Sequence, residues 1–163
     1  MGVMAWFEPT HDWDAVDGAA PDPGPSFQVP MLPFGSPLES ARALGKPDAF
    51  EWRSRRERHF ELLYARRGLR LRFKEGQLID VSYLIGRDAC EHTAFKPSQP
   101  RAPDGSRLTA DLDRGQIVEL FGEPDPGGSD DTCLQIFLGH GVVSDFYLDE
   151  QGHLREWSLY PEN

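Results

Sequence analysis

Residues 36–50 read SPLESARALGKPDAF and residues 108–125 read LTADLDRGQIVELFGEPD. Both stretches carry apolar residues at helical spacing and then end in Gly-x-Pro-Asp. A glycine just past the last turn accepts the left-handed backbone that closes a helix, and a proline two residues later prevents its continuation. The two stretches therefore predict short helices at about 36–44 and about 111–121, and Asp111 is the expected cap of the second helix.

Three runs of alternating apolar residues follow each predicted helix. In the first half they are HFELLY, GLRLRF and QLIDVSYLI, between residues 59 and 85. In the second half they are TCLQIFL, VVSDFYL and HLREWSLY, between residues 132 and 160. Alternation over about four to eight residues is typical of a strand with one buried face. Glycines at positions 68, 76 and 152 separate the runs and favour hairpin turns.

The two halves share the order helix, strand, strand, strand, which indicates an internal duplication. The expected fold class is α+β, with two tandem helix–β–β–β repeats forming an antiparallel sheet and the helices on one face. The first unit spans residues 34–86, a linker spans 87–105, and the second unit spans 106–163. Residues 1–33 are expected to form an irregular strap, because glycine and proline crowd residues 17–25. Its aromatic residues favour packing on the fold: Trp6, Phe7, Trp13 and Phe27.

The second predicted helix with its stop, and the hairpin YLDEQGHL at residues 147–154, carry a family resemblance. They resemble the unit of the SmpA/OmlA lipoproteins of outer-membrane assembly and of the beta-lactamase inhibitory proteins, in which the unit is duplicated. The resemblance covers residues 34–86 and 106–160. It implies a scaffold that binds a protein partner, without naming the target.

Charge is distributed unevenly along the 163 residues, which carry 27 acidic and 17 basic side chains and a net charge of -10. Residues 51–103 hold 12 basic and 7 acidic side chains, whereas residues 104–163 hold 13 acidic and 3 basic ones. The acidic balance argues against a protein that coats nucleic acid, because such binding relies on neutralising phosphates. The asymmetry favours steering of a charged partner, or else attraction between the two halves within one fold.

The stretch WRSRRERH at residues 52–59 is the most unusual in the chain. We expect an exposed loop here, between a helix stop and a strand. Arginine offers a rigid fork for carboxylate or phosphate, and tryptophan and arginine are frequent interface hot spots. The alternative is a solvated loop that faces the acidic second half. The matching loop of the second unit is acidic. The predicted partner-binding residues are Trp52, Arg53, Arg55, Arg56, Arg58, Asp130 and Asp131.

Metal and catalytic motifs are not found in the sequence. Cys90, His92 and Cys133 lack the paired spacing of a zinc site, so no metal and no cofactor are expected. Whether Cys90 and Cys133 pair is left open. Nucleophile-elbow, P-loop, dinucleotide and zinc-protease motifs are missing, so no catalytic residue is assigned. Most of the acidic and histidine residues between 140 and 153 fall at expected turns, where such residues are commonly solvated.

The sequence thus predicts a non-catalytic, soluble protein-binding module, of the kind represented by immunity or inhibitor proteins that block a toxin or an enzyme. A basic partner is favoured because the chain is acidic. Neither nucleic acid nor membrane is an expected partner, and the absence of a run of about 20 apolar residues fits a cytoplasmic protein. The alternative is a small enzyme or small-ligand-binding domain that uses a concave sheet face. The oligomeric state is left open.

Overall fold

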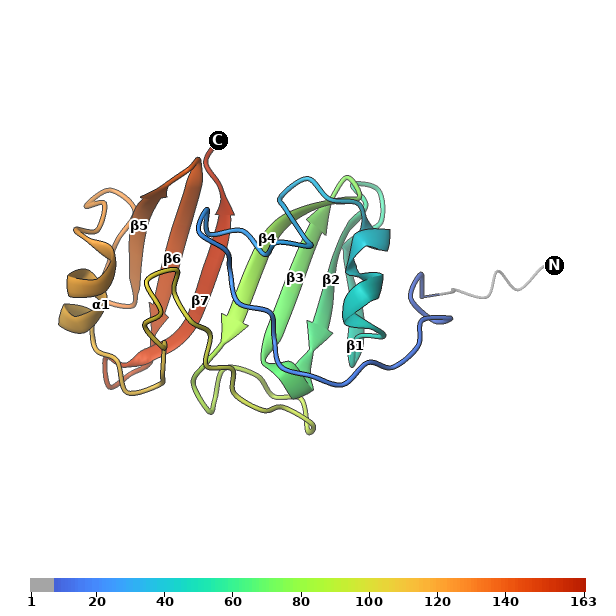
Figure 1. The fold of residues 1–163 in the computed structure, drawn as a ribbon, viewed down its shortest axis with the longest axis horizontal. Helices are drawn as coiled ribbons and strands as arrows, with labels where there is room; N and C mark the ends of the chain where they lie inside the picture. The colour runs from blue at the N-terminus through green and yellow to red at the C-terminus, as the bar shows by residue number, and fades with distance from the viewer. Residues whose placement is uncertain (1–7) are drawn as a thin grey trace.

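The computed structural model describes residues 8–163, in which strands predominate (Figure 1). The first half contains η1 (Leu38–Leu44), β1 (Ala49–Ser54), β2 (His59–Tyr64), η2 (Ala65–Arg67), β3 (Leu69–Lys74) and β4 (Gln77–Leu84), where η1 and η2 are 3₁₀ segments. The second half contains α1 (Arg114–Phe121), β5 (Cys133–Gly139), β6 (Val142–Leu148) and β7 (Leu154–Pro161). Within residues 8–163, no helix is long and apolar enough to cross a membrane.

The strands of the described range form one seven-stranded sheet in the order β1-β2-β3-β4-β7-β6-β5. Every neighbouring pair is antiparallel. The two halves meet where residues 81–84 of β4 pair with residues 156–159 of β7. We call this pairing the seam. The last strand of each half is therefore central, and β1 and β5 are the two edges.

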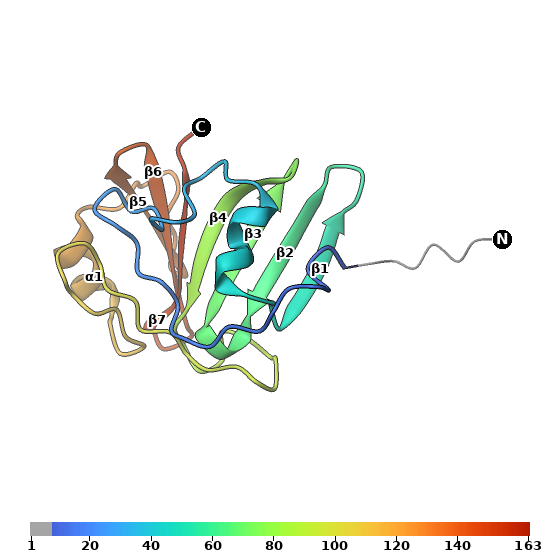
Figure 2. The same ribbon diagram turned by 45° about the vertical axis from the view of Figure 1, so that its right-hand side comes forward.

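One face of the sheet is covered and carries the hydrophobic core. The two views show η1, α1 and irregular chain lying over this same face (Figures 1 and 2). The alternating apolar residues of the strands point into this layer and are buried, among them Phe73 and Phe146. Trp157 stacks on Tyr83 with ring centroids 5.4 Å apart, and both rings are fully buried. The core is therefore continuous across the seam.

Irregular chain supplies part of the cover over this core. In the segment 8–33, Trp13, Val29 and Leu32 are buried in the core. The Tyr83 hydroxyl donates a hydrogen bond of 2.7 Å to the Pro21 carbonyl, which ties this segment to β4. Trp6 and Phe7, which the sequence also suggested as packing residues, lie outside the described residues.

The expected fold of two helix–β–β–β repeats is wrong. The first half has four strands, because residues 49–54 form the edge strand β1 instead of a loop. Phe50 and Trp52 face the core side, where both pack against Phe60, and Glu51 and Arg53 alternate with them. The run of arginines that begins at Arg53 hid this alternation.

The predicted helices also differ from the observed ones. Residues 38–44 are 3₁₀ helix rather than α-helix, since a segment of seven residues that Pro37 precedes and Gly45 ends is short for a stable α-helix. The second helix begins at Arg114 and not near Asp111. Asp113 caps it, because its side chain accepts from the Gln116 backbone N–H at 2.9 Å, and the Gln116 side chain accepts from the Asp113 N–H at 3.0 Å. The prediction that the two helices are equivalent elements of a repeat is therefore wrong, because one is a 3₁₀ segment and the other an α-helix.

Candidate functional site

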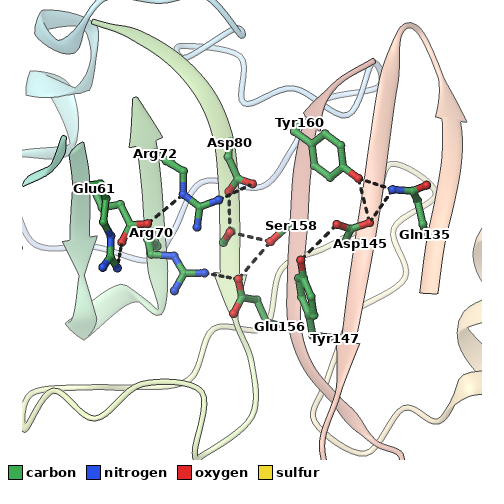
Figure 3. Close-up of polar contacts among 12 residues, drawn as sticks. Glu61, Arg70, Arg72, Asp80, Gln135, Asp145, Tyr147, Glu156, Ser158 and Tyr160 are labelled. Atoms are coloured by element: carbon green, nitrogen blue, oxygen red, sulfur yellow. Dashed lines mark hydrogen bonds and ion pairs between the residues drawn. The ribbon is translucent and has the colours of Figure 1, made fainter. Parts of the chain in front are cut away.

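Because η1 and α1 lie over the core side of the sheet, they do not cover its second face, which we call the open face (Figures 1 and 2). Figure 3 shows polar side chains of this face. Its side chains are those that alternate with the core residues along the strands. They are mostly polar and come from both halves of the chain. The residues of this face that form the polar contacts drawn in Figure 3 are Glu61, Arg70, Arg72, Asp80, Gln135, Asp145, Tyr147, Glu156, Ser158 and Tyr160.

Glu61 on β2 is the centre of an ion-pair network in the first half. Its carboxylate accepts from Arg53 Nη2 at 2.8 Å and from Arg72 Nε at 2.9 Å, and its side chain is only 8% exposed. Burial alone raises the pKa of a carboxyl group, but the two arginine hydrogen bonds outweigh it and hold the pKa of Glu61 below its usual value. Glu61 is therefore an ionised, fixed part of this face.

The pKa of Asp80 on β4 is shifted in the opposite direction from that of Glu61. Burial raises its pKa, although the Ser82 hydroxyl donates a 2.7 Å hydrogen bond and the arginines at positions 70 and 72 lower it. Arg72 Nη1 lies 3.9 Å from Asp80 Oδ2, which is a long ion pair. The open face thus holds two carboxyl groups whose environments shift their pKa values in opposite directions.

Polar side chains also cross the seam. Arg70 on β3 pairs with Glu156 on β7. The Ser158 hydroxyl donates to Glu156 Oε1 at 3.1 Å and lies 2.8 Å from the Ser82 hydroxyl. Within residues 8–163, the buried Nε of Arg70 has no hydrogen-bond partner. These contacts fix the relative position of the two halves on the open face.

A second cluster lies on the β5–β6–β7 half. Asp145 accepts hydrogen bonds from the Tyr160 hydroxyl at 3.0 Å and from the Tyr147 hydroxyl at 3.2 Å. Gln135 Nε2 donates to the Tyr160 hydroxyl at 2.8 Å. Burial and the Asp145 charge raise the pKa of both tyrosines, so the phenols remain proton donors at neutral pH. Tyr147 is still 38% exposed and Phe137 on β5 is 52% exposed.

Two hollows lie beside Tyr147 on this face. One of about 370 Å³ is lined by Arg70, Asp80, Tyr147 and Glu156 among others. The other, of about 440 Å³, lies between residues 72–80 and residues 145–163. It is found where β4 and β7 separate, since residues 77–80 of β4 lie outside the seam. Asp80 lines both hollows, so the open face is grooved along the junction of the halves.

The residues predicted from sequence are not brought together. Trp52 and Arg53 lie on β1, and only Arg53 faces the open face, where it bonds Glu61. Arg55, Arg56 and Arg58 occupy the β1–β2 turn. The guanidinium of Arg55 lies 5.7 Å from the Trp52 ring centre. That turn and the predicted acidic loop therefore belong to opposite edges of the sheet.

The acidic loop precedes β5 and is organised by local hydrogen bonds. Asp130 Oδ1 accepts from the Thr132 N–H at 2.7 Å and from the Cys133 N–H at 2.9 Å, while Asp131 is exposed. Because β1 and β5 run in the same direction, the turn after β1 and the loop before β5 also lie at opposite ends of the sheet. The predicted basic and acidic loops cannot form one site.

The cysteines are free thiols. Cys90 borders a hollow beside β1 and β2, and Cys133 starts β5 on the far edge, so the two lie on different halves of the sheet. Burial and nearby aspartates raise the pKa of Cys133 to about 12. Within residues 8–163, no group of three or more histidine, cysteine or acidic side chains is arranged to hold a metal ion.

The open face offers fixed charges and hydrogen-bond donors beside exposed aromatic rings. Sequence reasoning missed the network of Glu61, Arg70, Arg72 and Asp80, although the alternation LRLRFK at residues 69–74 is the signal of a polar strand face.

Comparison with family models, with characterised proteins and with solved structures gives no significant match for this chain.

Proposed function

We propose that this chain is a protein-binding module whose partner docks on the open face of the sheet, over β5, β6 and β7. The observation that carries the proposal is the exposure of Tyr147 and Phe137 around a pre-ordered polar cluster. Tyrosine is enriched at interface hot spots, because its ring buries area while its hydroxyl stays hydrogen-bonded.

The aromatic surface follows the β5–β6 strand pair. Gln135 pairs with Asp145, Cys133 with Tyr147, and Phe137 with Val143. Because Phe137 lies four residues along β5 from Cys133, the two exposed rings stand on the order of 13 Å apart. Asp145 lies between them and holds Tyr147 in place. A docking partner therefore meets a rigid surface and loses little side-chain entropy on this side.

Charge favours a basic partner. Residues 104–163 carry 13 acidic and 3 basic side chains, and Asp145 and Glu156 belong to the open face. Complementary charge raises association rates and suppresses wrong partners. We therefore propose an immunity or inhibitor role, in which the chain covers a basic toxin or enzyme. Cysteines placed on different halves of the sheet fit a reducing compartment, and we propose the cytoplasm.

Affinity capture from the native host tests this function. Wild-type protein is expected to retain one stoichiometric partner at about 50 mM salt and to release it at about 500 mM, since salt screens exposed charges. The variant Tyr147→Ala/Phe137→Ala should lose that partner. Met31→Ala is the matched control, because Met31 is 50% exposed but belongs to the N-terminal segment. Equal retention by the double variant would contradict docking on the open face.

A second function class is binding or conversion of a small molecule in the grooves beside Tyr147. The raised pKa of Asp80, which lines hollows of about 370 and 440 Å³, favours it. Asp80→Asn separates the two functions. For a small-molecule site this variant should abolish ligand binding, whereas for protein docking it should leave capture of the partner unchanged.

A further inference from the structure

A cationic hollow lies away from the open face, at the end of the sheet where β2 turns into β3. Its volume is about 440 Å³. It is lined by η2, by the N-terminal segment and by the chain after β4, and we call it the basic hollow. Its charged lining residues are Asp22, Arg66, Arg67, Lys96, Arg101 and Arg107.

Backbone contacts hold these three chain segments together. The Lys96 N–H donates to the Ala65 carbonyl at 2.9 Å, and the Ser98 N–H donates to the Leu84 carbonyl at 2.8 Å. Gly68 permits this close crossing, since a Cβ there would lie 2.5 Å from Ser98 N and 2.8 Å from the Lys96 carbonyl oxygen. The basic hollow is thus a built feature of the fold and not a chance gathering of mobile side chains.

Most of its positive charge is not neutralised by carboxylates. Arg66 pairs with Asp48 at 2.8 Å. Within residues 8–163, the other four cations form no ion pair with an acidic side chain. Three of them donate to neutral oxygens instead: Arg67 to the Val16 carbonyl, Arg101 to the Gly105 carbonyl, and Arg107 to the Gln99 side chain. Each guanidinium retains further N–H donors.

The charge of the basic hollow is positive, whereas the net charge of the whole chain is negative. Among its described lining residues Asp22 is the single acidic one, and its Oδ1 already accepts the Arg101 backbone N–H at 2.8 Å. Five cations against one carboxylate stand out in a chain of net charge -10. A long polyanion would meet the acidic remainder of the surface, so the charge distribution favours a small ligand.

We propose that the basic hollow binds a small polyanion carrying two or more phosphate or carboxylate groups. Arginine forks match both groups in geometry, and hydrogen bonds between ionised partners are the stronger ones. The volume lies within the usual range of ligand sites. This site is independent of the open face, since the proposed protein partner is basic and docks elsewhere.

Isothermal titration of the full chain at about 50 mM salt tests this site, with pyrophosphate and citrate as the two probes. Wild-type protein is expected to bind at least one of them with a dissociation constant below about 1 mM. Tighter binding of pyrophosphate identifies a phosphate site, and tighter binding of citrate identifies a polycarboxylate site. Failure of both probes to bind would overturn the proposal.

Charge-matched variants locate the binding. Lys96→Gln/Arg107→Gln should weaken the better probe by about tenfold or more, which is about 1.4 kcal/mol. Arg55→Gln/Arg56→Gln removes the same charge from the β1–β2 turn at the other end of the sheet, and should change the affinity by less than about twofold. Circular dichroism verifies that both variants are folded. An equal loss in both variants would mean a general charge effect and would overturn the site.

Discussion

Glu61 shows at the scale of one residue how the open face is held together. It lies on β2 with a side chain that is 8% exposed, yet it is charged, because Arg53 and Arg72 each donate a hydrogen bond to it. A buried charge without such partners is costly. Removing the carboxylate takes one acceptor from each guanidinium, and Arg53 and Arg72 then keep only their contacts with Glu51 and Asp80.

We expect Glu61→Ala to lower the free energy of unfolding by about 1–3 kcal/mol, since it removes charge-assisted hydrogen bonds from a partly shielded network. Urea unfolding measures the change. Glu39→Ala is the control, because Glu39 forms an ion pair with Arg42 but is 69% exposed. Its effect should stay below about 1 kcal/mol. Similar losses in the two variants would contradict the central role of Glu61.

The pH dependence of stability provides a separate prediction. The pKa of Glu61 in the folded protein lies below the ordinary glutamate value of 4.5. Its stabilising effect is therefore present above pH 4.5 and is lost as the pH falls through the folded-state pKa. The difference in unfolding free energy between wild type and Glu61→Gln should therefore be largest near neutral pH and shrink in acid. A difference that stays constant from about pH 7 to about pH 3 would refute the assigned ionisation.

Only part of this residue-scale picture is accessible from sequence. The alternation of Arg70 and Arg72 with leucines predicts a polar strand face. The carboxylate that each arginine contacts depends on how the strands pair. Arg72 lies opposite Glu61 on β2 and Asp80 on β4. Arg70 pairs with Glu156 only because β4 is paired with β7. A local pattern contains no such long-range information, so the sequence pointed to Trp52 and the arginine turn instead.

At the scale of elements, the turn η2 links the sheet to the chain after β4. Gly68 closes this turn at φ +60°, and the backbone at residues 96–98 passes directly over it. A side chain at this position would force that backbone away and would also strain the left-handed conformation.

Gly68→Ala should therefore cost more than the same change at another left-handed glycine. Gly141→Ala is the matched control, since Gly141 has φ +69° with nothing within 4 Å of its added Cβ. We expect the control to cost about 1–2 kcal/mol from backbone strain, and Gly68→Ala to cost a further 1–3 kcal/mol or so from the clash. Urea unfolding measures the loss of stability in both variants. Equal losses would contradict a close approach of residues 96–98 to Gly68.

Strands were easier to predict than helices in this chain. The six apolar alternations coincide with β2, β3, β4, β5, β6 and β7. The missed strand, β1, alternates Phe50 and Trp52 with charged residues, and an arginine-rich stretch follows it directly. The glycines of the two Gly-x-Pro-Asp stops do follow the last residues of η1 and α1, but such a stop does not reveal whether the preceding helical turns are α or 3₁₀.

At the scale of the whole molecule, the two halves share one sheet and one core. The seam joins β4 to β7, and the Trp157 ring stacks on Tyr83 and lies 5.9 Å from Phe146. Neither half can unfold without exposing this buried cluster. We therefore expect the molecule to unfold as one cooperative unit. Because the two halves are held together, the polar contacts across the seam lie on a rigid surface.

Thermal and urea unfolding should accordingly follow a single transition, with secondary structure and tryptophan fluorescence changing together. Trp157→Ala should lower the stability of the whole chain by about 3–5 kcal/mol, because it opens a cavity between the halves. Two separate transitions in the wild-type protein would show that the halves unfold independently and would contradict a single cooperative unit.

The most direct test of the central proposal is the dissociation constant of the purified complex with the captured partner, measured for wild type, Tyr147→Ala/Phe137→Ala and Met31→Ala. Docking on the open face predicts at least about thirtyfold weaker binding for the double variant, since truncation of an interface hot spot costs about 2 kcal/mol or more. The Met31→Ala variant should match wild type. Unchanged affinity in the double variant, or an equal loss in the control, would contradict the assignment of the open face as the binding surface.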